Sequence, residues 1–119
     1  MKPDVPLTEL TEPHKEVLRY LQCRGLAVWH EVSFPPYFVD LYLPRYHAAV
    51  EVNGPLHVRE KDDERDEELL AIYRLPVHHI VTEDAKYPER WWMGVAIFLN
   101  NAKPSKQQRW ELCEGKVNW

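Results

Sequence analysis

Long apolar segments are missing from this sequence. No run within its 119 residues approaches the length of a membrane-spanning helix. The start, Met1-Lys2-Pro3-Asp4, lacks the apolar core of a secretory signal peptide. Repeats and low-complexity tracts are absent as well. These absences argue against a helical membrane protein or a repeat protein, and we expect a cytoplasmic protein with no membrane partner.

Cysteine is scarce too. The two cysteines, Cys23 and Cys113, have no spacing that matches a metal-binding or redox motif. We therefore expect free thiols in a reducing compartment, and neither a disulfide framework nor a zinc site made by cysteine and histidine.

Basic residues are outnumbered, with 15 Lys and Arg against 19 Asp and Glu, for a net charge of −4. Phosphate contacts supply much of the affinity of DNA-binding proteins, so this balance counts against a nucleic-acid partner. The charge is segregated, however. Residues 60–68 hold seven of the acids, whereas residues 86–119 carry six basic and three acidic side chains. The C-terminal part can therefore still present a basic surface.

Two short segments, 37–43 and 48–53, have the alternating pattern of β-strands. Pro44 ends the first segment and begins a turn of four residues. The alternation predicts that Val39, Leu41 and Leu43 share one face of the first strand. The segments together predict a β-hairpin.

Polar side chains occupy the other face of this hairpin. The alternation places Asp40 there in the first strand, and Glu51 and Asn53 in the second. Two carboxylates held side by side repel each other unless they share a proton or a cation. Carboxylate oxygens at the ends of strands suit Mg²⁺ or Mn²⁺. The hairpin therefore predicts a site for a divalent cation.

This pattern resembles a known one. Asp40 followed by Glu51-x-Asn53 is similar to the core of the PD-(D/E)XK nuclease superfamily. One branch, which holds the very-short-patch mismatch-repair endonuclease, carries V-D … E-x-D-G-x-x-H before a helix with Asp and Arg. Residues 11–82 resemble that branch, and the matching string is Val39-Asp40 … Glu51-Val52-Asn53-Gly54-Pro55-Leu56-His57.

The sequence departs from the family at three positions. Val39 stands where the family has Pro, and His14 stands where its first helix has Glu. Asn53 stands where the superfamily has Lys and where this branch usually has Asp. The last difference removes the standard cation of the site, so another residue must supply its role or the role is lost.

The resemblance implies an α/β fold with a restriction-endonuclease-like core of order α-β-β-β-α-β. In it, helices flank a mixed sheet and a C-terminal helical extension follows. We expect one nuclease-like domain over 1–119, with a loose N-terminus at 1–10, the core at 11–82, and a C-terminal helix and tail at 83–119. The elements that the sequence predicts are helices at 12–24, 59–74 and from 88, and strands at 26–34, 37–43, 48–53 and 77–81.

The resemblance also implies roles for the site residues. Asp40, Glu51 and the backbone carbonyl of Val52 would bind the metal ion, which polarises the scissile phosphate and activates the attacking water. Asn53 can donate a hydrogen bond but supplies no charge. His57 is the first candidate for the general base or the acid of the leaving group, because an unperturbed histidine titrates near neutral pH. Lys61, in the next helix, is the second candidate.

Further residues can contribute from the helices and the turn. His14 lies on the apolar face of the first helix and is expected to point toward the core. Either His14 or Glu16 can be the first-helix contributor to the site. Arg65 can clamp a phosphate in a bidentate manner, or form an ordinary surface ion pair. With Arg45 and Lys15, it makes up our set of DNA-binding candidates.

The sequence thus predicts a Mg²⁺-dependent DNA endonuclease that hydrolyses phosphodiester bonds. Because so short a chain has little room for a sequence-reading domain, we expect it to recognise branched or mismatched DNA, such as a Holliday junction, in DNA repair or recombination. The helix from residue 88 is apolar almost all round, so it is either buried or part of an oligomer interface. The resemblance to branched-DNA resolvases of the superfamily, which are homodimers of comparable size, implies a homodimer. The alternatives are a catalytically inactive nucleic-acid-binding module and a protein-interaction subunit that uses the acidic helix 59–68.

Overall fold

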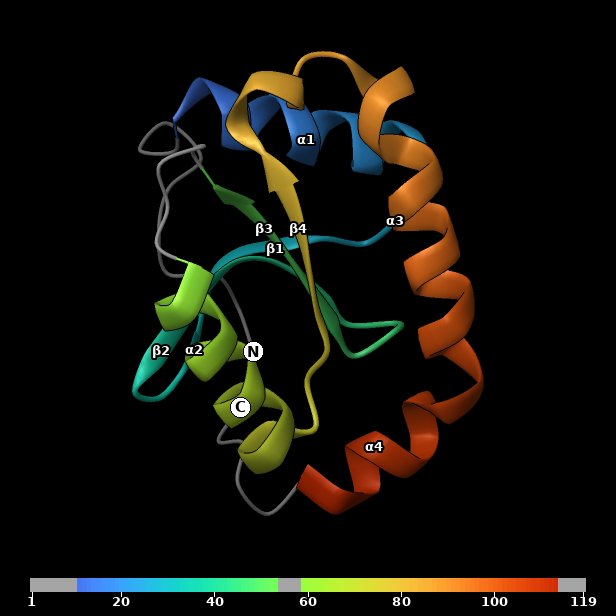
Figure 1. Ribbon diagram of the computed structural model, residues 1–119. Coiled ribbons are helices and arrows are strands. Elements are labelled where there is room, and N and C mark those ends of the chain that lie inside the picture. Colours follow the sequence, from blue (N-terminus) through green and yellow to red (C-terminus); the bar gives the residue numbers. More distant parts are fainter. Residues whose placement is uncertain (1–10, 54–58, 114–119) are drawn as a thin grey trace.

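The computed structural model describes residues 11–53 and 59–113, and only the backbone of residues 59–62. The order of elements is the α-β-β-β-α-β core that the sequence predicted, followed by a C-terminal helical extension (Figure 1). The elements are α1 (Glu12–Cys23), β1 (Trp29–Phe34), β2 (Tyr37–Leu43), β3 (Ala48–Asn53), α2 (Arg59–Tyr73), β4 (Val77–Val81), η2 (Thr82–Asp84), α3 (Pro88–Ala102), η3 (Lys103–Ser105) and α4 (Lys106–Cys113).

The four strands form one mixed sheet in the order β1-β2-β3-β4. The pairs β1–β2 and β2–β3 are antiparallel, as expected for strands joined by short turns. β3 and β4 are parallel because α2 carries the chain back to the same end of the sheet. The predicted α/β fold class with a mixed sheet is therefore confirmed.

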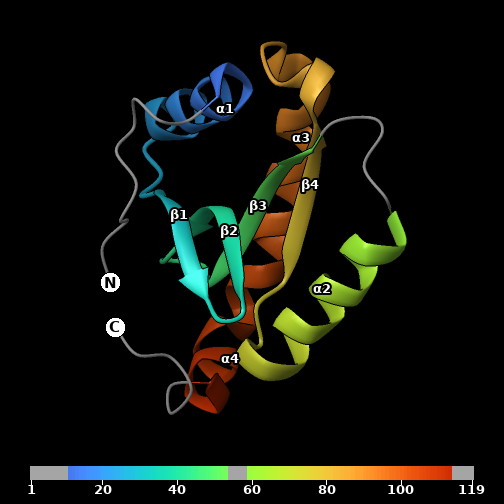
Figure 2. The same ribbon diagram turned by 90° about the vertical axis from the view of Figure 1, so that its left-hand side faces the viewer.

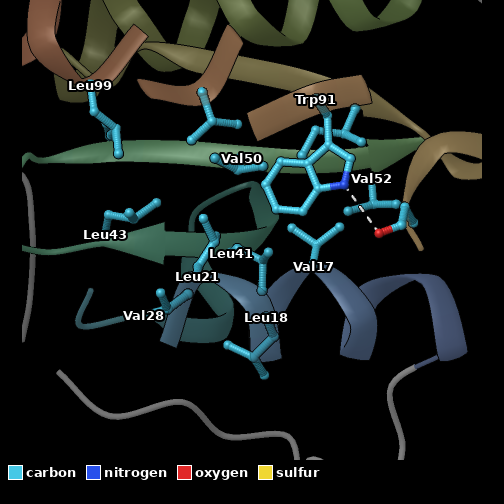
Figure 3. Close-up of a cluster of buried hydrophobic side chains, with 14 of the residues drawn as sticks. Val17, Leu18, Leu21, Val28, Leu41, Leu43, Val50, Val52, Trp91 and Leu99 are labelled. Atoms are coloured by element: carbon cyan, nitrogen blue, oxygen red, sulfur yellow. Dashed lines mark hydrogen bonds between the residues drawn. The ribbon is translucent and has the colours of Figure 1, made fainter. Parts of the chain in front are cut away.

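Helices cover both faces of the sheet (Figure 2). On one side, which we call the α1 face, α1 and α3 pack against the strands; on the other, the α2 face, α2 packs. Figure 3 shows the α1 face, where Val17 and Leu21 of α1 meet Leu41 and Val50 of the strands. Trp91 of α3 closes this cluster. None of the described helices is long and apolar enough to span a membrane.

The pleat changes phase at one rung of the sheet. The β1–β2 ladder pairs His30 with Leu41 and Val32 with Val39, but within these described strands it omits the rung between them. Glu31 lies at that rung with φ of 49°, a left-handed conformation that side chains other than glycine seldom adopt. The pleat therefore reverses on either side of it.

This reversal overturns one prediction. Val39 packs on the α2 face with Tyr42, whereas Leu41 and Leu43 lie on the α1 face. The expected common face of Val39, Leu41 and Leu43 is thus wrong for Val39. The alternation rule assumes an unbroken pleat, and the left-handed residue in the neighbouring strand breaks it.

Candidate functional site

The Asp40 and Glu51 carboxylates lie where β2 and β3 separate. The regular ladder between these strands ends at the pair Leu41–Val50. Beyond this pair, the backbone N–H groups donate to side-chain carboxylates. Asp40 N donates to Glu51 Oε2 at 3.0 Å, and Val52 N donates to Asp40 Oδ2 at 2.9 Å. The hairpin therefore brings the two acids together, as the spacing of the residues predicted.

Charge repulsion and burial act strongly on this pair. Glu51 is only 1% exposed. Burial, reinforced by the hydrogen bond and the charge of Asp40, raises the pKa of Glu51 to about 9 although Arg65 opposes the shift. Burial also opposes ionisation of Asp40, but hydrogen bonds with His14 and Glu51 outweigh it and lower the pKa of Asp40. Without a bound cation, the pair therefore holds one proton near neutral pH.

His14 reaches the pair from α1. Its Nε2 lies 3.0 Å from Asp40 Oδ2, and this hydrogen bond is the main reason that the pKa of His14 is raised. Its Nδ1 contacts the hydroxyl of Thr11, so the Thr11 side chain is not used as a helix cap. Glu16 is exposed and lines a separate cavity of about 290 Å³ between α1 and residues 82–86. Of the two first-helix candidates, the fold brings only His14 to the carboxylates.

Arg65 reaches the pair from α2. Its Nη2 lies 2.6 Å from Glu51 Oε1 and 3.7 Å from Asp66 Oδ1. The residue predicted to clamp a phosphate thus contacts a carboxylate of the candidate site itself.

Asn53 belongs to a second cluster beside the first. His79 of β4 lies between two oxygens, with Nδ1 2.6 Å from Asn53 Oδ1 and Nε2 2.5 Å from Asp66 Oδ2. No sequence pattern assigned a role to His79 or Asp66. The available signal was the predicted crossover, because a parallel β4 puts His79 level with Glu51 in the sheet.

Glu31 is a third acid near the pair, and the sequence did not predict it. It occupies the distorted rung beside Asp40, and burial, followed by the charge of Asp40, raises its pKa. Left-handed backbone at a residue other than glycine costs free energy and is frequent at functional sites. No sequence pattern signals this conformation.

The remaining predicted residues lie elsewhere or outside the described part of the chain. Lys15 pairs with Glu12 at 3.4 Å, and Arg45 is exposed in the turn between β2 and β3, at the end away from Asn53. His57 is outside the described residues. Lys61 lies in α2, but its side chain is also outside them.

The donors at the pair suit a hard divalent cation. The described residues contain no group of three or more His, Cys, Asp or Glu side chains arranged for a metal ion. The candidate donors are instead two carboxylates and the carbonyl of Val52. In a strand, the N–H and C=O of one residue point to the same side, so this carbonyl faces the side of Asp40, which accepts from Val52 N. Mg²⁺ commonly binds one or two carboxylates and keeps several waters, so the set fits.

One further observation supports this fit. Glu51 Oε1 is buried and has no hydrogen-bond partner among the described residues. A buried carboxylate oxygen without such a partner is costly, and a cation would relieve that cost.

Comparison with known proteins identifies the fold. The chain resembles a solved structure, the "Homing Endonuclease I-Bth0305I Catalytic Domain", with a TM-score of 0.65 and 19% sequence identity over 78% of this chain and 98% of that one. At this identity the likeness shows a shared fold. No protein-family model matches the sequence, and a search of curated proteins finds no match either. The chain therefore has the fold of a nuclease catalytic domain.

Proposed function

We propose that this protein is a metal-dependent endonuclease that hydrolyses phosphodiester bonds in DNA. The observation that carries the proposal is the buried Asp40–Glu51 pair, held where two strands of a nuclease-like sheet separate. The fold alone does not assign an activity. A buried pair of acids with an unsatisfied oxygen is costly to stability, and such clusters are typical of catalytic sites.

Each residue of the pair has a specific part in this proposal. Asp40, Glu51 and the carbonyl of Val52 would hold Mg²⁺ or Mn²⁺, which supplies Lewis-acid activation of the phosphate and of the attacking water. His14 orients Asp40 through their 3.0 Å contact. The paired backbone bonds from Asp40 N and Val52 N fix both carboxylates before any substrate arrives.

The missing superfamily lysine needs a substitute. Asn53 is held by His79, which Asp66 holds in turn, so the Asn53 amide is positioned to donate to substrate or water. His57 and Lys61 remain our candidates for the general base or acid. The E-x-D-G-x-x-H pattern of the very-short-patch-repair branch supports His57. Lys61 is supported because it lies four residues, about one helical turn, before Arg65.

We further propose a branched or mismatched DNA substrate and a homodimer. On α3, Met93 and Ile97 are exposed one turn apart, at 69% and 54%, which favours a contact with a second copy.

The test is metal-dependent cleavage of a matched DNA panel. Linear duplex, mismatched duplex, single strand, flap and four-way junction are each incubated with Mg²⁺ or Mn²⁺. Wild type should cut a branched or mismatched member, whereas Asp40→Asn and Glu51→Gln should not. Glu89→Gln, an exposed acid of α3, is the control and should cut normally.

A nucleic-acid-binding module without activity is the second candidate, because Asn53 removes the lysine charge. It predicts no cleavage of any substrate and DNA binding that survives Asp40→Asn. A protein-interaction subunit would show neither metal binding nor salt-dependent DNA binding.

A further inference from the structure

The unsatisfied polar atoms of the described residues are concentrated in one place. Four buried side-chain atoms there lack a hydrogen-bond partner: Glu51 Oε1, Arg65 Nε, Arg65 Nη2 and Asp66 Oδ1. Among the described residues, all buried side-chain atoms that lack a hydrogen-bond partner therefore belong to these three neighbouring residues. Buried polar groups are almost always paired, so a group of this kind calls for an explanation.

Arg65 and Glu51 are close enough to form an ion pair, but they do not form a hydrogen bond. Arg65 Nη2 and Glu51 Oε1 are 2.6 Å apart, but the N–H bonds of Nη2 are poorly directed at the oxygen, so the contact is an ion pair without a hydrogen bond. The guanidinium thus supplies a positive charge near Oε1 without making a well-directed bond. A cation placed at Oε1 would do the same, so the guanidinium stands close to the place that a metal ion needs.

The unpaired atoms of Arg65 form one complete edge of its guanidinium. Nε and Nη2 are parallel donors that can bind both oxygens of a carboxylate or a phosphate. In this protein, the edge has no hydrogen-bond partner among the described residues. It is thus suited to a second oxyanion once its contact with Glu51 Oε1 is released.

We propose that Arg65 is an exchangeable counter-ion of Glu51. It occupies the place beside Glu51 Oε1 while the site is free of metal, yields Oε1 when a divalent cation binds and the pair loses its proton, and then clamps a substrate phosphate with its Nε–Nη2 edge. This inference rests on the proposed metal-dependent nuclease activity and specifies how metal binding would free Arg65 to bind a DNA phosphate.

Asp66 keeps the displaced side chain close to the site. Its Oδ1 lies 3.7 Å from Arg65 Nη2 and is itself without a hydrogen-bond partner among the described residues. Its other oxygen is held by His79 at 2.5 Å, which fixes the carboxylate. Asp66 therefore offers Arg65 an ionic contact that remains after Glu51 Oε1 is given up. The exchange would couple phosphate binding to the presence of metal.

The first measurement is Mn²⁺ binding without DNA, by isothermal titration calorimetry. Arg65→Gln removes the competing cation, so Mn²⁺ should bind on the order of tenfold more tightly than to wild type. Arg65→Lys keeps a positive charge and should stay close to wild type. Arg90→Gln, which removes a surface partner of Asp84, is the matched control and should change nothing.

The second measurement is binding of a fluorescein-labelled linear duplex with Ca²⁺ in place of Mg²⁺, by anisotropy. Arg65→Gln and Arg65→Lys should both bind the duplex more weakly, because neither has the two-donor edge. Arg65→Lys retains the charge, so it tests the clamp even where Arg65→Gln does not fold.

Unchanged or weaker Mn²⁺ binding by Arg65→Gln would overturn the inference, and so would duplex binding by Arg65→Lys at the wild-type level. Glu51→Gln separates this failure from failure of the proposed function. If wild type and Glu51→Gln bind Mn²⁺ equally, the metal site itself is wrong. If only Glu51→Gln loses Mn²⁺ but Arg65→Gln matches wild type, the metal site stands and the counter-ion role is wrong.

Discussion

The two ends of the β2–β3 hairpin each bury a polar side chain, but they differ in how fully that side chain is hydrogen-bonded. At the turn, His47 is fully buried; at the open end, Glu51 is buried almost as completely. His47 Nε2 donates to the carbonyl of Tyr73 at 2.7 Å, and Tyr42 donates to His47 Nδ1 at 2.9 Å. Glu51 retains an oxygen with no hydrogen-bond partner among the described residues.

The turn end is also tied to the C-terminal helices. Arg109 of α4 donates to the carbonyls of Tyr46 at 2.8 Å, His47 at 2.5 Å and Ala102 at 2.7 Å. The buried polar groups there have hydrogen-bond partners in the protein, whereas Glu51, Arg65 and Asp66 at the open end retain buried atoms without one among the described residues. We infer that the turn end stabilises the fold, and that on the proposed function the open end keeps costly polar groups for ligand binding.

The largest effect should come from breaking the open end. We expect Glu51→Gln to lower DNA cleavage by about 10³-fold, because charge stabilisation at the reacting phosphate is lost. The same change should leave the free energy of unfolding within about 1 kcal/mol of wild type or raise it, since it removes a buried acid that is costly to ionise. Cleavage assays and urea unfolding check both parts, and a large loss of stability would contradict the second.

A substitution at the turn end should instead lower stability and leave DNA cleavage unchanged. Arg109→Ala removes charged hydrogen bonds to the carbonyls of Tyr46, His47, Arg74 and Ala102 and should lower the free energy of unfolding by about 3 kcal/mol. Urea unfolding measures this loss, with Lys103→Ala, an exposed residue of η3, as the control. If folded Arg109→Ala protein cleaves DNA as wild type does, the two ends are separable; a loss of cleavage without a loss of stability would mean that they are not.

Lowering the pH should reduce the stability that the turn end provides. Burial lowers the pKa of His47 to about 4, so the folded state binds a proton less readily than the unfolded state. The stability that His47 provides is present above its unfolded pKa and is lost as pH falls toward 4. Between pH 6.5 and 4.5 we expect a loss of about 2 kcal/mol, from 1.36 kcal/mol per pKa unit.

Urea unfolding of wild type and His47→Gln across this range checks the pH prediction. The difference in free energy between them should shrink as the pH falls. A constant difference would show that His47 does not titrate with the expected shift.

The smallest effect should come from the backbone of the open end. Glu31 has a left-handed φ of 49°, which asparagine adopts more readily. Glu31→Asn should therefore raise the free energy of unfolding by about 0.5 kcal/mol, at the low end of the cost of such strain. Urea unfolding detects this change, and a loss of stability would show that the Glu31 side chain contributes more than its strain costs.

Much of the fold was predictable from local signals. The bounds of β2, β3 and β4 were predicted to the residue, because prolines or polar residues flank alternating apolar segments. β1 begins at Trp29, three residues later than predicted, since Leu26 to Val28 are apolar without joining the sheet. The pairing of Asp40 with Glu51 followed from the hairpin alone.

The rest of the site depends on geometry that no local pattern contains. The contact of His79 with Asn53 requires the parallel register of β3 and β4, and the contact of Arg65 with Glu51 requires the rotation of α2 over the sheet. The misplacement of Val39 follows from a left-handed residue in another strand. Contacts between distant elements therefore had to be observed.

Thermal unfolding with and without Mn²⁺ tests the central claim most directly. A ligand that binds only the folded state raises the melting temperature. If the open end of the hairpin is a metal site, Mn²⁺ should raise the melting temperature of wild type and leave that of Glu51→Gln unchanged. An equal rise in both proteins, or a rise in neither, would contradict the account.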